Sequence, residues 1–89
     1  MNNDDQFNEL AGRIEGLALA FLQLAAEAEM QGAVDGPFLC HLLRNRADVL
    51  PADRSFRDST VRVLYHLADE LDHARRLRQH AALLVQRDA

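Results

Sequence analysis

This sequence has one cysteine, Cys40, and neither lysine nor tryptophan. A chain with one cysteine cannot close an intrachain disulfide, which excludes the small disulfide-rich folds and gives secretion no support. Proline and glycine are also scarce, with two and four residues respectively. Because both residues break helices, their scarcity favours long uninterrupted helices.

A basic leader and a long apolar run are missing too. Residues 1–5 carry two aspartates, where a secretory signal peptide would be basic. The most apolar stretch, residues 17–26, has about half the length that a membrane-spanning helix requires. We therefore expect a cytoplasmic protein that does not contact a membrane.

All ten basic residues are arginine, which together with the abundant alanine is typical of a GC-rich bacterial genome. The 14 acidic residues outnumber them, and the net charge is -4. A general nucleic-acid-binding protein needs a positive footprint, so we expect no nucleic-acid partner. Residues 1–40 carry seven acids and one arginine (-6), whereas residues 41–89 carry seven acids and nine arginines (+2). This asymmetry modestly favours packing between the halves, or antiparallel pairing of two chains.

Leucine and alanine, both strong helix formers, dominate the apolar residues, which make up 48% of the chain. The sequence predicts one all-α domain over residues 1–89, with helices at about 5–31, 37–47 and 55–86. Gly32 is expected to end the first helix, and Asp35 or Gly36 to cap the second, with Pro37 in its first turn. The apolar face of the third helix would run from Phe56 to Val85. We expect the two long helices to form an antiparallel hairpin with the short helix between them, and two copies to complete a bundle.

The first predicted helix is apolar on more than one side. Apolar residues recur at alternating steps of three and four from Phe7 to Ala28, which are the a and d positions of a heptad seam. Residues 17–26 contain one polar residue in ten. A surface helix normally buries one stripe, so this helix needs partners on at least two sides. In so short a chain, we expect the second partner to be another subunit.

The predicted function is that of a protein–protein interaction module, such as an adaptor, a regulator or an accessory subunit, and not that of an enzyme. We expect a homodimer that associates through the first helix, with a further protein partner as another use of that surface. Two glycines one turn apart either allow close approach of a second helix or are simply tolerated. Leu22 lies off the heptad seam, so Leu22→Glu is expected to prevent association and spare the fold. The expected interface residues are Gly12, Gly16, Leu17, Leu19, Phe21, Leu22 and Leu24.

Metal binding on the third predicted helix is an alternative function. His66, His73 and His80 are seven residues apart, so they lie on one line along the helix. Glu70 and His73 have the Glu-x-x-His spacing of di-iron bundles, and imidazole and carboxylate groups suit zinc or iron. The candidate ligands are His66, Glu70 and His73, and outside this alternative no cofactor is expected.

The histidine column has two other interpretations. On a helical wheel it lies at the edge of the core, where histidines form ordinary contacts with neighbouring acids. If two chains met along it, protonation near about pH 6 would bring like charges together and weaken the dimer. No phosphate-binding loop, nucleophile elbow or zinc-protease motif occurs, so the sequence offers no catalytic residue.

Three arginines at residues 75–78 follow a group of acids. Asp72 can pair with Arg75 or the next arginine at helical spacing, so we expect a solvated, self-paired face and not a phosphate site. Arg78 differs because its phase points toward the apolar side, where it would either lie along the core edge or meet an acid from the first helix. Cys40 lies in an apolar cluster and is expected to be a small buried side chain.

Overall fold

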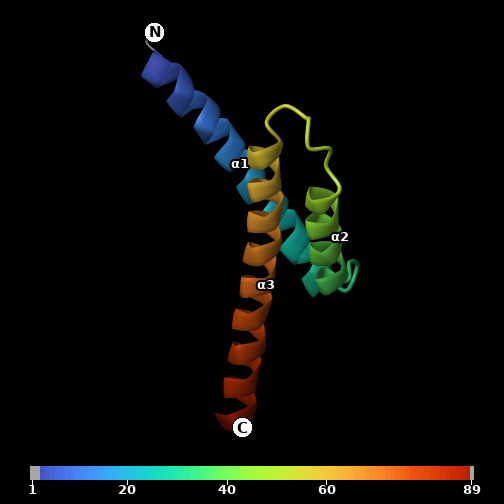
Figure 1. Cartoon of the computed structure of the whole chain (residues 1–89). Helices are drawn as coiled ribbons and strands as arrows, with labels where there is room; N and C mark the ends of the chain where they lie inside the picture. The colour runs from blue at the N-terminus through green and yellow to red at the C-terminus, as the bar shows by residue number, and fades with distance from the viewer. Residues whose placement is uncertain (1–2, 89) are drawn as a thin grey trace.

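The computed structural model describes residues 3–88, and in that range every regular element is a helix (Figure 1). Helix α1 spans Asn3–Met30, α2 spans Gly36–Asp48 and α3 spans Arg57–Asp88. The all-α prediction is confirmed, and each helix begins and ends within two residues of its predicted bound. Within residues 3–88, no helix combines the length and the apolar content needed to cross a bilayer.

Gly32 ends α1 through a local backbone arrangement. Its φ of 76° lies in the left-handed region that glycine adopts without strain. The backbone N–H of Gly32 donates to the carbonyl of Glu29 at 3.0 Å. The N–H of Ala33 donates to the carbonyl of Ala28 at 2.9 Å. This pair of bonds is the Schellman motif, which turns the chain sharply toward α2.

Asp35 caps the start of α2. Its side chain accepts a hydrogen bond from the backbone N–H of Phe38 at 3.0 Å. Pro37 occupies the first turn, where the missing N–H would have had no partner inside the helix. Of the two caps that the sequence offers, Asp35 and Gly36, the helix uses Asp35, and Pro37 lies in the first turn as predicted.

The start of α3 differs from the prediction because Phe56 lies outside the helix. Its φ of 61° is a left-handed conformation that aromatic residues rarely adopt. The side chain is 85% exposed and does not contribute to the apolar face of α3, contrary to the sequence prediction. The Phe56 carbonyl accepts hydrogen bonds from the backbone N–H and the hydroxyl of Thr60, each at 3.0 Å, so this residue marks the boundary of the helix.

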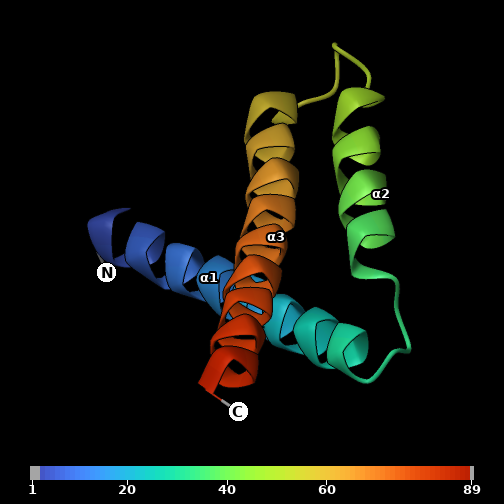
Figure 2. The ribbon, with the colours of Figure 1, turned by 90° about the horizontal axis from the view of Figure 1, so that it is seen from below.

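The helices do not form the predicted hairpin of two long antiparallel helices. The antiparallel neighbours are α2 and α3, whereas α1 crosses α3 obliquely (Figures 1 and 2). Most of the contacts between helices join α2 and α3. Helix α2 packs along α3 with Leu39, Cys40 and Leu43. Because α2 occupies that side of α3, α1 contacts the same core only at the point where it crosses α3.

Polar contacts tie α2 to α3 near the loop that joins them. The hydroxyl of Tyr65 donates to the carboxylate of Asp48 at 2.6 Å, which raises the pKa of the tyrosine. The Arg57 Nε group donates to the carbonyl of Leu50 at 3.1 Å. These contacts hold the beginning of α3 beside the end of α2.

The core is small and lies where the three helices meet. Cys40 is 1% exposed, and its thiol donates to the carbonyl of Ala68 at 3.4 Å, so the prediction of a buried cysteine is confirmed. Burial also raises the pKa of this thiol. Small side chains allow the helices to approach closely. The buried cluster consists of Ala25, Cys40, Ala68 and Leu71, with Phe21, Leu22, Leu39 and Leu43 packed around it.

Both long helices extend well beyond this core (Figure 1). The radius of gyration is 16.7 Å, whereas a compact domain of this length has one of about 12 Å. We call residues 3–20 the α1 arm and residues 76–88 the α3 arm. The arms leave the crossing in different directions, so neither covers the other (Figures 1 and 2).

Candidate functional site

A chain of ion pairs joins all three helices beside the core. Glu29 of α1 accepts hydrogen bonds from Arg75 and from Arg78, whose Nη2 lies 3.0 Å from Glu29 Oε2. Arg75 Nη1 also donates to Asp72 Oδ1 at 2.6 Å. The other oxygen of Asp72 accepts from Arg44 Nη2 of α2 at 2.7 Å. One continuous network therefore connects α1, α3 and α2.

Hydrogen bonds within the network favour the charged forms of Asp72, Arg75 and Arg44. The hydrogen bond from Arg44, aided by Arg75 and opposed by burial, lowers the pKa of Asp72 to about 2. Burial disfavours the charge of Arg75, but its hydrogen bonds with Glu29 and Asp72 outweigh this effect and raise its pKa. Hydrogen bonds with Asp69 and Asp72 raise the pKa of Arg44. Because each charge is compensated near neutral pH, the network acts as a structural clamp.

Two contacts of this clamp follow from the sequence. The Asp72–Arg75 pair and the contact of Arg78 with an acid of the first helix are both confirmed. The expectation that the Asp72–Arg75 face is solvated is wrong, because these side chains are 20% and 16% exposed. Arg44 is a member of the clamp that no sequence pattern predicts. Its partners, Asp69 and Asp72, are 25 and 28 residues away, and no local spacing signals such a contact.

The histidine column of α3 does not assemble into a metal site. His66, Glu70 and His73 are all exposed. Within residues 3–88, no three His, Cys, Asp or Glu side chains lie close enough to hold a metal ion. Glu29, an acid of α1 that faces α3, is held instead by two arginines. The predicted ligands therefore remain on the solvent side of α3.

Most of the predicted interface residues of α1 lie in solvent. Leu17, Leu19 and Leu24 are 73%, 58% and 71% exposed. Gly12 and Gly16 are exposed as well, and no atom lies within 4 Å of the position that a Cβ would occupy at either residue. This part of α1 is open to a partner, and its glycines face no helix of the same chain.

Phe21 and Leu22 have a different environment from the other predicted interface residues. Both pack against the buried cluster at the crossing and are partly buried. The expectation that Leu22 lies outside the chain's own core is wrong, because α1 meets α3 through the side that carries Leu22, Ala25 and Glu29. A glutamate at position 22 would therefore damage the fold as well as any interface.

The heptad seam of α1 faces water along most of its length. Exposed apolar side chains gathered on one face mark an interaction surface on a small protein. The seam residues that are more than half exposed are Phe7, Leu10, Ile14, Leu17 and Leu24.

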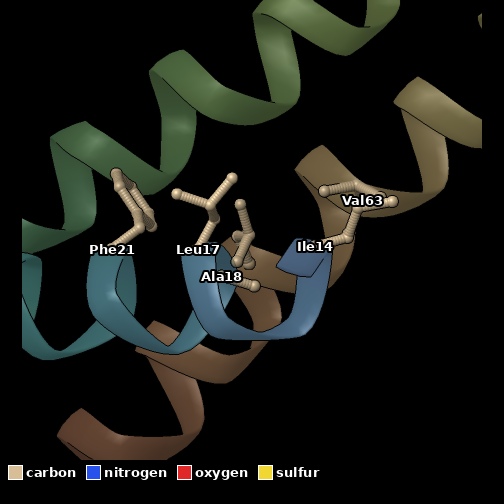
Figure 3. A pocket seen from close by; sticks show the side chains of 6 residues that line it. Ile14, Leu17, Ala18, Phe21 and Val63 are labelled. Carbon is tan, nitrogen blue, oxygen red and sulfur yellow. The ribbon is translucent and has the colours of Figure 1, made fainter. Parts of the chain in front are cut away.

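An apolar groove of about 230 Å³ continues this seam where α1 crosses α3 (Figure 3). Its walls come from both helices, and all six lining residues are apolar. A helix side chain from another molecule fits this chemistry better than a polar ligand, because the groove offers apolar contact without polar side chains. The lining residues are Ile14, Leu17, Ala18 and Phe21 of α1 with Val63 and Leu67 of α3.

The chain exposes more surface than a compact protein of the same mass. Its accessible surface is 6955 Å² for 10.0 kDa. A compact monomer of this mass has about 5,200 Å², so the excess is about 1,700 Å². For comparison, each partner in a typical stable complex buries about 800 Å². The chain therefore has enough surface for a stable interface.

Comparisons of this chain with protein-family models, curated proteins and solved structures find no match. The surface is thus characterised by its own features, which are an exposed heptad seam, an adjoining apolar groove and a charged clamp that holds the crossing together.

Proposed function

We propose that this protein is a small helical protein–protein interaction module that self-associates as a homodimer through α1. The observation that carries the proposal is the exposed heptad seam of α1, where Leu10 and Leu17 are 58% and 73% exposed. The excess accessible surface of about 1,700 Å² supports it, because it exceeds the roughly 800 Å² that each partner buries in a typical stable complex.

A second copy of the same chain is the partner that this seam fits best. Heptad seams pack against helices that carry the same repeat, and a second copy of this chain carries that repeat in its own helices. In a closed two-fold dimer, each copy offers and receives the same contacts, so no seam stays uncovered. On this proposal the dimer works as an adaptor, a regulator or an accessory subunit in a bacterial cytoplasm, and no bond-making chemistry is assigned to it.

The first test is the mass in solution, measured by light scattering behind a sizing column across a dilution series. We expect a mass of twice 10.0 kDa that falls toward 10.0 kDa only at high dilution. A mass of one chain at every concentration would contradict the proposal.

The second test replaces Leu17 by Glu, with Asn8→Glu as the matched control. Both positions are exposed on α1, and both changes add one negative charge. Losing the burial of Leu17 twice in a symmetric dimer costs about 4 kcal/mol, or roughly a thousandfold in the dissociation constant. The control should associate like the wild type, and circular dichroism should show unchanged helix content in both. Equal association of the two variants would place the interface elsewhere.

A further inference from the structure

The end of α3 carries a second exposed apolar seam. Leu77 and Leu84 are seven residues apart and are 57% and 47% exposed. Ala74 and Ala81 alternate with them at steps of three and four, which is again the a and d pattern. From residue 76 to residue 87, every residue except Arg78 is exposed. The α3 arm therefore presents an unpartnered seam of its own.

This second seam leads directly into the apolar groove. Val63 and Leu67, which form the α3 wall of the groove, occupy the same heptad positions at the start of the helix. Glu70 is the one charged residue between the groove and Ala74 on this line. Each chain thus has two exposed seams, one on each arm, and both reach the crossing.

The two arms carry opposite charges. The α1 arm has four acids and one arginine, a net charge of -3. The α3 arm has three arginines and one acid, but Arg78 is paired with Glu29 of the same chain, which leaves a net charge of +1. Two α1 arms side by side would bring -3 against -3, and two α3 arms would bring +1 against +1. Only the pairing of an α1 arm with an α3 arm brings opposite charges together, and charge complementarity of this kind selects partner and orientation.

We infer that the dimer is reciprocal, with the α1 arm of each copy packed along the α3 arm of the other. This inference rests on the proposed function and specifies which surface of the second copy covers the seam. At 1.5 Å per residue the arms are about 27 Å and about 20 Å long, so the α3 arm can lie along about three quarters of the α1 arm. The contact occurs twice in a two-fold dimer, so each exposed seam of one chain faces a seam of the other.

A charge-reversal experiment with two complementary variants tests the pairing. Asp4→Arg with Glu15→Arg changes the α1 arm from -3 to +1, and Arg76→Glu with Arg87→Glu changes the α3 arm, with Arg78 paired to Glu29, from +1 to -3. Each variant alone should dimerise on the order of tenfold more weakly at low salt, because both of its contacts then join like charges. An equimolar mixture should form a heterodimer with the affinity of the wild type, because both contacts are again of opposite sign.

Native mass spectrometry reads the result, since the two variants differ in mass. If α1 arms pair with each other instead, the α1 variant dimerises more tightly than the wild type, because -3 against -3 becomes +1 against +1. The α3 variant would then behave like the wild type. That outcome overturns the reciprocal pairing and leaves the proposed function intact. A wild-type chain that is monomeric at every concentration overturns both, and it is seen before any variant is made.

Discussion

The crossing of the helices and the two arms differ in which side chains they bury and which they expose. At the crossing, small side chains such as Ala25 and Ala68 are buried, and charged groups are paired across helices. Along the arms, large apolar side chains such as Phe7 and Leu17 stay in water. The difference indicates that the crossing stabilises the single chain, while the apolar side chains of the arms add little to its stability; on our proposal they are surfaces for association.

The largest expected effect comes from a core leucine. Leu71 is 3% exposed, so Leu71→Ala should lower the free energy of unfolding of the monomer by about 3 kcal/mol, through lost burial and the cavity left behind. Leu17→Ala removes the same atoms from a side chain that is 73% exposed, and it should change that free energy by less than about 0.5 kcal/mol. Urea unfolding of dilute, monomeric protein measures both. Equal losses would remove the distinction between crossing and arm.

The next largest effect comes from the clamp. Glu29→Gln should lower the free energy of unfolding by about 2 to 3 kcal/mol, because Arg78 then loses the carboxylate that it pairs with and Arg75 keeps only Asp72. Glu27→Gln is the matched control, since Glu27 is an exposed acid two residues away on the same helix. It should have little effect in the same urea titration. A Glu29→Gln variant with the unfolding free energy of the wild type would show that the clamp contributes nothing to stability.

The smallest expected effect is a fall in the free energy of unfolding at low pH. The folded chain lowers the pKa of Asp72 from 3.8 to about 2, which corresponds to about 2 kcal/mol of stability. A lowered folded pKa means that this stability is fully present above pH 3.8 and is lost as the pH falls through 2. Comparing the unfolding free energy of the wild type with that of Asp72→Asn measures it.

The gap between the wild type and Asp72→Asn should close as the pH drops from neutral toward 2. Asp69→Asn serves as the control, because the Asp69 side chain is 67% exposed and its ion pair with Arg44 should contribute little to the unfolding free energy. A gap between the two proteins that stays constant with pH would contradict a role for the charge of Asp72.

Sequence patterns predict those features that depend on neighbours along the chain. The stop at Gly32, the cap at Asp35 and the Asp72–Arg75 pair each involve residues at most five positions apart, and helix geometry alone fixes them. The burial of Cys40 was also predicted, because its apolar neighbours in the short helix mark the face that turns inward.

Features set by the angle between helices were not predicted. The heptad seam of α1 suggested an antiparallel partner, yet α1 crosses α3 through the side that carries Leu22. Arg44 gained its role only because α2 lies beside α3 and brings it to Asp69 and Asp72. No spacing within α1 or α2 encodes either result.

The sequence by itself determined that this protein consists of helices, where each helix ends, and that α1 has more apolar surface than a single stripe. Local hydrogen bonding and the helical period are sufficient for these features, because both act over a few residues. Only the tertiary structure decided which apolar side chains are used inside the chain and which are left outside. That division depends on the crossing of α1 over α3. The two helices touch over a short length, and the side of α1 that packs there carries Ala25 against Ala68 of α3, so most of the heptad seam is left outside the contact.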